Sequence, residues 1–247
     1  MFQPTNNVIA ILFITTLINS FTTYVSWQRR KTKGGYYLAW AVLVIAIWTL
    51  SVGLDYAAVP ISLKVFFEKL EYTFHSTTIT LLAMFALAYA GYKDWLTKKA
   101  VRAFFLITSI SNILLAWTND WHGFLWKSFT RSEFGNNTVI FEHGTGYYWA
   151  SITGYLMILI FVLPLWQASR TGSELSRRQA RLLCITSLLS MISSTIYLEG
   201  NQQLKGVDWT PIIYSMLGMI FILVLYGTRL LDLVPIARYT MIEQMND

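Results

Sequence analysis

The chain has 247 residues, of which 55% are hydrophobic, 16% aromatic and only 13% charged. That charged share is about half that of an average soluble domain, and a soluble fold this apolar has too few polar groups to cover its surface. The net charge of +6 is split into short clusters between long apolar runs, which argues against nucleic acid as a partner. Cys184 is the single cysteine, which excludes a disulfide framework or a cysteine-based metal site within one chain. We therefore expect membrane lipid as the main surroundings of the chain.

Seven apolar runs are long enough, or nearly so, to cross about 30 Å of hydrocarbon as helices. Backbone amides in hydrocarbon must bond within their own segment, so each run is predicted to be helical. Tryptophan and tyrosine mark many of the run ends, as expected at a membrane interface. Residues 1–228 are thus predicted to form an all-α membrane protein, a seven-transmembrane helix bundle. The predicted spans are residues 8–27, 36–54, 61–92, 100–117, 147–166, 181–198 and 210–228.

Lysine and arginine gather in alternate connections between these spans. The clusters lie within residues 29–33, 93–102 and 170–181, and the C-terminal tail adds two more arginines. The intervening connections hold fewer basic residues and most of the acidic ones. Basic residues close to span ends favour the cytoplasmic side. The pattern predicts an odd number of spans, with the N-terminus outside the cell and the C-terminus in the cytoplasm.

The third span has an unusual polar face. Glu68, Glu71 and His75 follow Lys64 at helical spacing, which places all four on one side of the helix. Ionisable groups two or three turns inside a membrane helix are costly and normally face the bundle interior. The face is predicted either to form the floor of a ligand or proton site or to belong to a structural polar network. Lys64 and Lys69 by themselves are interpreted as snorkelling anchors.

The longest connection, residues 118–146, is too aromatic to be disordered. We expect it to fold onto the helix ends as a hairpin around residues 135–137. Its aromatic and polar side chains would either cover a small molecule as a lid or form an aromatic belt that seals the bundle. The ligand-binding candidates here are Trp117, Asn119, His122, Trp126 and Trp149.

Asp208 precedes Thr210 and Pro211, which suit the first positions of a helix. Asp208 is a further ligand-binding candidate, which would face the same outer cavity as the polar face of the third span. Asn19 and Asn112 are expected to form hydrogen bonds between helices. A metal site from Asp120, His122, Glu142 and His143 is conceivable, but no typical metal-ligand spacing supports it. We expect no metal, no cofactor and no catalytic residue in this chain.

Residues 229–247 are predicted to continue the seventh helix into the cytoplasm as a signalling helix. Pro235 predicts a kink at the membrane boundary. Leu230, Leu231 and Val234 begin an apolar stripe that needs a partner, either a second copy or a following domain.

Several short segments together carry a family resemblance. They are residues 67–72, 85–91, 118–119 with His122 and Trp126, 177–179, 208–211 and 229–238. The last segment is the most specific of them. In this combination the chain resembles the N-terminal seven-helix region of membrane histidine kinases, in which the helices precede a PAS domain and a kinase core.

The resemblance implies a sensor in the inner (plasma) membrane of a bacterium or archaeon, multi-pass and homodimeric. It would respond to an unknown small-molecule ligand and control autophosphorylation in cytoplasmic PAS and kinase domains. Signal transmission would pass through Arg229, Asp232, Pro235 and Arg238. No ATP-binding glycine boxes and no phospho-acceptor histidine region occur in the sequence, so we expect no kinase activity from this chain and a missing output domain.

Two other classes of seven-helix protein remain as alternatives. A transporter or proton-relay protein would use the acidic residues of the third span. A retinal protein is disfavoured, because it needs a lysine in the last span and residues 209–228 contain none.

Overall fold

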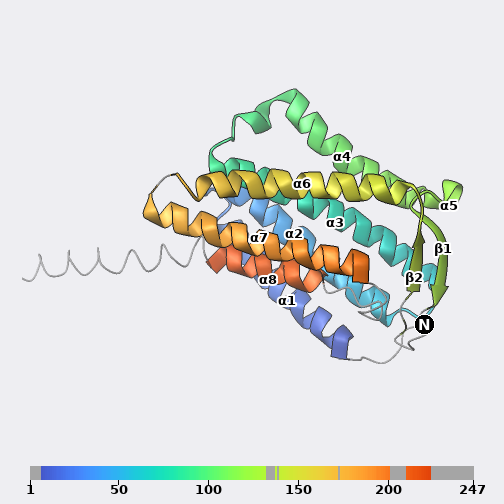
Figure 1. Cartoon of the computed structure of the whole chain (residues 1–247). Coiled ribbons are helices and arrows are strands. Elements are labelled where there is room, and N and C mark those ends of the chain that lie inside the picture. The colour runs from blue at the N-terminus through green and yellow to red at the C-terminus, as the bar shows by residue number, and fades with distance from the viewer. Residues whose placement is uncertain (1–6, 132–136, 138, 172, 201–209, 224–247) are drawn as a thin grey trace, which may run out of the picture.

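The computed structural model describes residues 7–131, 137, 139–171, 173–200 and 210–223. Seven longer helices make up most of this part and lie side by side as a bundle (Figure 1). They are α1 (Asn7–Gln28), α2 (Gly35–Ala57), α3 (Ile61–Ala90), α4 (Lys99–Trp117), α6 (Gly146–Ala168), α7 (Glu174–Gly200) and α8 (Thr210–Ile222). The shorter elements are a 3₁₀ turn (Trp95–Thr97), α5 (Asn119–His122), β1 (Trp126–Arg131) and β2 (Val139–His143).

Five helices, α1, α2, α3, α4 and α6, are long and apolar enough to cross a membrane. Their bounds agree with the predicted spans to within a few residues. The other two differ from them: α7 begins before its predicted span and carries Arg177, Arg178 and Arg181 in its first turns, and the described part of α8 has 13 residues. The structure is therefore that of a mostly helical membrane protein with five candidate spans.

The two ends of the bundle differ in chemistry. The α1–α2, α3–α4 and α6–α7 connections share one end, the basic end, and the strands lie at the other, the hairpin end (Figure 1). At the basic end, cations lie over the rings of tryptophans at helix ends: Arg30 over Trp27 at 4.9 Å and Arg170 over Trp166 at 3.6 Å. Such pairs suit the interface between lipid and water.

Gly34 and Gly91 make the sharp turns at the basic end. Both adopt positive φ angles, 76° and 101°, which glycine enters without steric penalty. Gly34 also lies against Phe85: a Cβ built on Gly34 would stand 2.9 Å from Phe85 Cδ2. Glycine at this position thus lets the start of α2 pack against α3.

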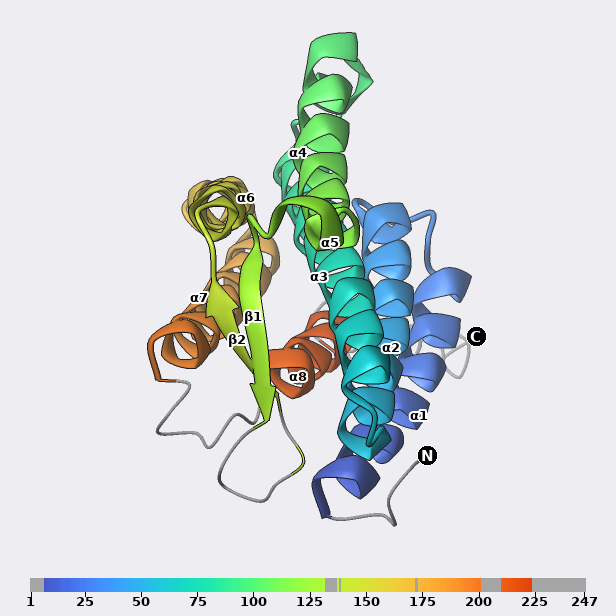
Figure 2. The same ribbon diagram turned by 90° about the vertical axis from the view of Figure 1, so that its right-hand side faces the viewer.

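The bundle core is centred on α2 and α3 and includes residues from α1, α6, α7 and α8. Polar pairs cross between helices within it. Asn19 Nδ2 donates to Ser215 Oγ at 2.7 Å, and Asn112 Nδ2 donates to Thr153 Oγ1 at 3.0 Å. The prediction that both asparagines bond between helices is confirmed. Helix α4 is peripheral and diverges from the other helices toward the basic end (Figure 2).

The connection between α4 and α6 contains an antiparallel hairpin, as the sequence predicts. Strand β1 pairs with β2 from Trp126 opposite His143 to Arg131 opposite Val139. Strands β1 and β2 form the only sheet in the described residues. The hairpin is tied to the α2–α3 turn, because Arg131 donates to the Val59 carbonyl at 3.1 Å and Asn137 to the Ala58 carbonyl at 2.9 Å.

Candidate ligand-binding site

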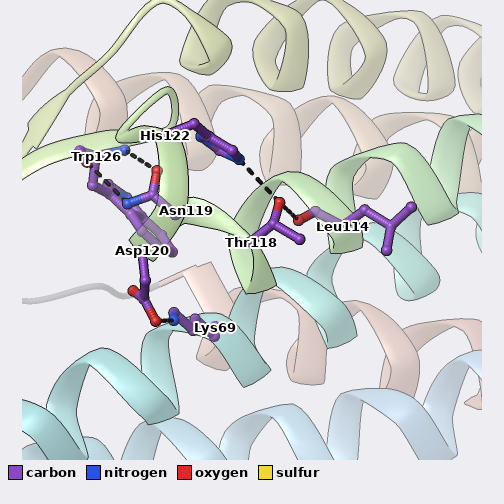
Figure 3. Close-up of polar contacts among 7 residues, drawn as sticks. All are labelled: Lys69, Leu114, Thr118, Asn119, Asp120, His122 and Trp126. Carbon is purple, nitrogen blue, oxygen red and sulfur yellow. Dashed lines mark hydrogen bonds and ion pairs between the residues drawn. The ribbon is translucent and has the colours of Figure 1, made fainter.

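Asn119 fixes the path of the chain between α4 and β1. Its buried side chain accepts hydrogen bonds from the backbone N–H groups of Leu125 (2.8 Å) and Trp126 (3.0 Å). Its Nδ2 donates to the Trp126 carbonyl at 2.9 Å (Figure 3). One side-chain amide thus provides hydrogen-bond partners for three backbone groups that no helix or strand pairing satisfies in this turn.

His122 is held by two hydrogen bonds on the same turn. Its Nδ1 accepts from the Phe124 N–H at 2.9 Å, so the neutral ring carries its proton on Nε2. Nε2 then donates to Thr118 Oγ1 at 2.9 Å, and Thr118 Oγ1 donates to the Leu114 carbonyl at 2.6 Å (Figure 3). Both ring nitrogens are therefore engaged in fixing the loop.

Lys64 and Lys69 are buried, and their interpretation as snorkelling anchors is wrong. Lys64 Nζ donates to the Asp55 backbone carbonyl at 2.6 Å and lies 3.7 Å from the Asp55 carboxylate. Lys69 Nζ donates to Asp120 Oδ2 at 2.7 Å (Figure 3). A buried ammonium needs such a partner, and hydropathy along the sequence does not show which partner the fold supplies.

Trp126 is the centre of a small apolar cluster, which we call the hairpin cap. It is 1% exposed and lies edge-on to Tyr72 of α3, with ring centroids 5.1 Å apart. The cap joins the hairpin to α3 and to the adjoining ends of α4 and α6, in agreement with the expectation that the loop folds onto the helix ends. Its members are Ala116, Leu125 and Trp126, with Tyr72, Leu115, Phe129, Phe141, Tyr147 and Ala150 packed around them.

A cavity of about 90 Å³ lies next to the hairpin cap, between α3, α4 and α6. Tyr72, Tyr147 and Ala150 belong to both the cap and the cavity wall. Deeper in the bundle the wall includes His75 of α3 and the hydrogen-bonded pair Asn112 and Thr153. Most of the surface that faces the cavity is apolar, which is typical of small-molecule sites.

His75 also connects the cavity wall to two neighbouring helices. Its ring lies 5.2 Å from that of Trp48 in α2 and 6.4 Å from that of Tyr214 in α8. Trp48 and Tyr214 are themselves 5.6 Å apart. This aromatic triangle gives α8 an indirect contact with the cavity.

The structure separates the candidates that the sequence grouped together. Of them, His75 lines the cavity, whereas Trp126 covers it as part of the cap. Glu68 and Glu71 are partly buried on α3 outside the cavity wall. Asn119 and His122 hold the loop, as described above.

The two remaining tryptophans join helices near the hairpin end. Trp117 Nε1 donates to Thr73 Oγ1 at 2.9 Å, and Trp149 Nε1 donates to Ser111 Oγ at 3.2 Å. Asp208 and the predicted transmission residues Arg229, Asp232, Pro235 and Arg238 lie outside the described residues.

Two residues weighed as metal ligands have other contacts. Glu142 accepts a hydrogen bond from Ser128 at 2.8 Å, and the His143 ring stacks on Tyr147 with centroids 3.9 Å apart. Partial burial lowers the pKa of His143 below its ordinary value. Within the described ranges, no group of three or more histidine, cysteine, aspartate or glutamate side chains could hold a metal ion.

Residues that the sequence did not single out complete the cavity. Thr153 and Gly154 of α6 and Tyr147 at its start belong to the wall. Small residues such as Thr153 and Gly154 in an apolar run indicate close helix packing or a cavity equally well, and a tyrosine at a span end is typical of the membrane interface. The sequence pattern therefore did not identify these residues as cavity-lining.

An apolar multi-helix bundle with a basic end and a capped cavity between three helices defines a multi-pass membrane protein. The family model for the N-terminal 7TM region of histidine kinase matches residues 11–235, and the chain belongs to that family. No curated protein matches the sequence.

Proposed function

We propose that this chain is the sensory membrane domain of a two-component histidine kinase. It would carry an extracytoplasmic or intramembrane signal to cytoplasmic PAS and kinase domains. The observation that carries the proposal is the family match, which covers residues 11–235. Within this proposal, residues 1–228 form seven spans in the inner membrane of a bacterium or archaeon, with the N-terminus outside.

The chemistry of the two ends supports this orientation. The basic end holds the arginine and lysine clusters of the α1–α2, α3–α4 and α6–α7 connections, and basic connections favour the cytoplasm. The hairpin end would then lie outside the cell, with the cap over the cavity. Residues 229–247 would follow α8 into the cytoplasm as the signalling helix, and a homodimer would pair two such helices.

The contacts of α8 supply a route for the signal. His75 belongs to the cavity wall and to the aromatic triangle with Trp48 and Tyr214. A ligand that packs against His75 would favour one arrangement of Tyr214 and hence of α8. A sensor of this kind needs two states that differ in ligand affinity.

The proposal is tested by placing a histidine-kinase core after Asp247 and measuring autophosphorylation in nanodiscs. We expect His75→Ala to change the phosphorylation level, because it removes the ring that joins α3 to α8. Leu17→Ala is the matched control, since Leu17 is 72% exposed on α1. Equal phosphorylation by the two variants and the parent, with equal amounts of folded protein, would refute this route.

A transporter or proton relay is the alternative function. Glu68, Glu71 and His75 on α3 are partly buried, and intramembrane carboxylates are a feature of proton pathways. Proteoliposomes with an internal pH dye distinguish the two functions, because a relay would acidify or alkalinise the lumen and a sensor domain would not.

A further inference from the structure

The cavity is closed on the side of the hairpin end. Leu125 and Trp126 are 0% and 1% exposed, and the cap to which they belong shares Tyr72, Tyr147 and Ala150 with the cavity wall. Within the cap, Trp126 and Tyr72 are in edge-on contact. A molecule from the water phase would have to displace this packed cluster to reach the cavity.

The side between α4 and α6 is different. The two helices approach each other near the hairpin end and diverge toward the basic end, as both views of the bundle show (Figures 1 and 2). Trp149 of α6 donates to Ser111 of α4 across this side at 3.2 Å. About one helical turn from this pair, Ile107 on α4 and Ile152 on α6 are apolar and 65% and 64% exposed. In a bilayer these side chains face acyl chains. The cavity therefore adjoins lipid more directly than water.

The wall selects against charged molecules. Among the described residues that line the cavity there is no aspartate, glutamate, lysine or arginine. Transfer of an unpaired charge into such a site is far more costly than transfer of a hydroxyl or carbonyl group that finds a hydrogen bond. The occupant that fits this wall is neutral.

The same wall offers hydrogen bonds. Asn112 has two N–H donors, and within the described part of the chain one of them is used, by Thr153 Oγ1 at 3.0 Å. The return bond from Thr153 Oγ1 to Asn112 Oδ1 is long, at 3.4 Å. Asn112 is 7% exposed, so its remaining capacity faces the cavity rather than solvent.

We infer that the cavity between α3, α4 and α6 binds a small, uncharged, lipid-soluble molecule with a hydroxyl or carbonyl group, which enters from the bilayer between α4 and α6. The polar group pairs with Asn112 and Thr153, and the apolar remainder lies toward the α4–α6 opening. At about 90 Å³, the cavity holds about six water-sized groups, enough for a polar head and its first carbons. The inference names the ligand class of the proposed sensor and rests on that function for its biological meaning.

The experiment uses 3-azioctanol, a neutral alcohol with a photoreactive diazirine, on the full chain in nanodiscs. After irradiation, mass spectrometry locates the label. We expect it on cavity-lining residues of α3, α4 and α6, and we expect excess 1-octanol to remove it. Label spread evenly over the lipid-facing side chains of all helices, and insensitive to 1-octanol, would overturn the inference.

Gly154 allows a substitution that fills the cavity. It lines the cavity, and a Cβ built on it meets no atom within 4 Å, so Gly154→Leu fills the cavity without a backbone clash. We expect Gly154→Leu to abolish labelling of the cavity while Gly154→Ala retains it. Leu159→Phe, a size increase at a half-exposed position of the same helix, is the control and should retain labelling. Retention of label in folded Gly154→Leu would place the bound probe elsewhere.

Asn112→Leu and a second competitor separate a true alcohol site from a gap filled by acyl chains. Loss of one hydrogen bond should weaken probe binding about fivefold, and 1-octanol should compete better than octane by a similar factor. Equal competition by octane, or undiminished labelling of Asn112→Leu, would show that only the hydrocarbon part is recognised and would refute the proposed pairing. Binding is measured without a kinase, so a failure here is distinguishable from a failure of the sensor function.

Discussion

Asn119 binds the backbone of Trp126 from both sides, accepting from its N–H at 3.0 Å and donating to its carbonyl at 2.9 Å. This pair sets where β1 begins and points the Trp126 ring at Tyr72. The side-chain amide of Asn119 thus fixes the part of the hairpin cap that closes the cavity, while Arg131 and Asn137 hold the far end of the hairpin.

Asn119→Ala should therefore destabilise the cap. It leaves three buried backbone groups without their partner, and we expect a loss of about 3 kcal/mol in the free energy of unfolding. Cys184, the single cysteine, is 8% exposed, so a thiol-reactive dye reports its exposure during thermal unfolding in detergent. Asn119→Asp, which keeps the acceptor for both N–H groups, should lose less. An unchanged melting temperature for Asn119→Ala would show that the loop is held by other contacts.

The ion pair of Lys64 and Asp55 gives a second prediction. The Lys64 side chain is 2% exposed, and removal of one partner of a buried pair leaves the other charge uncompensated. We expect Lys64→Met to reduce the free energy of unfolding by about 3–5 kcal/mol. The double variant Lys64→Met with Asp55→Leu should recover most of that loss in the same thiol-exposure assay. Additive losses in the double variant would indicate that the two side chains do not interact.

Gly34 gives a third prediction, at the basic end. Alanine there must adopt a φ of 76° and place its Cβ 2.9 Å from Phe85 Cδ2. The left-handed conformation alone costs about 1–2 kcal/mol, and the steric contact adds to it. Gly34→Ala should lower the melting temperature, whereas Gly154→Ala, which meets open space, should not. Equal melting of the two variants would contradict the close approach of α2 and α3.

Membrane orientation is the fourth prediction. In a Cys184→Ser background, Ser128→Cys of β1 should react with a membrane-impermeant maleimide in intact cells. Lys31→Cys, in the α1–α2 connection, should react only after permeabilisation, because basic connections are retained in the cytoplasm. Reaction of Lys31→Cys in intact cells would reverse the proposed topology and remove the basis for a cytoplasmic signalling helix.

Hydropathy alone located most of the helices, and charge alone distinguished the two ends. Runs without charged residues, such as the one within α2, cross lipid, where the backbone can form hydrogen bonds only with itself. They are therefore helical whichever other helices pack against them. The aromatic content of residues 118–146 likewise indicated a loop that packs onto the bundle, and β1 and β2 form there. These features can be predicted from the local sequence because each depends on the residues of one segment and on its apolar surroundings.

The partners of individual side chains were decided by tertiary structure. Lys64 and Lys69 looked like anchors in a linear sequence, but the turn after α2 and the loop after α4 bring Asp55 and Asp120 to them. The cavity depends on how far α4 stands from α3 and α6, which no single helix encodes. Helix formation is satisfied within a segment, whereas ion pairs, caps and cavities arise from the distances between segments, and those are fixed only when the whole bundle packs.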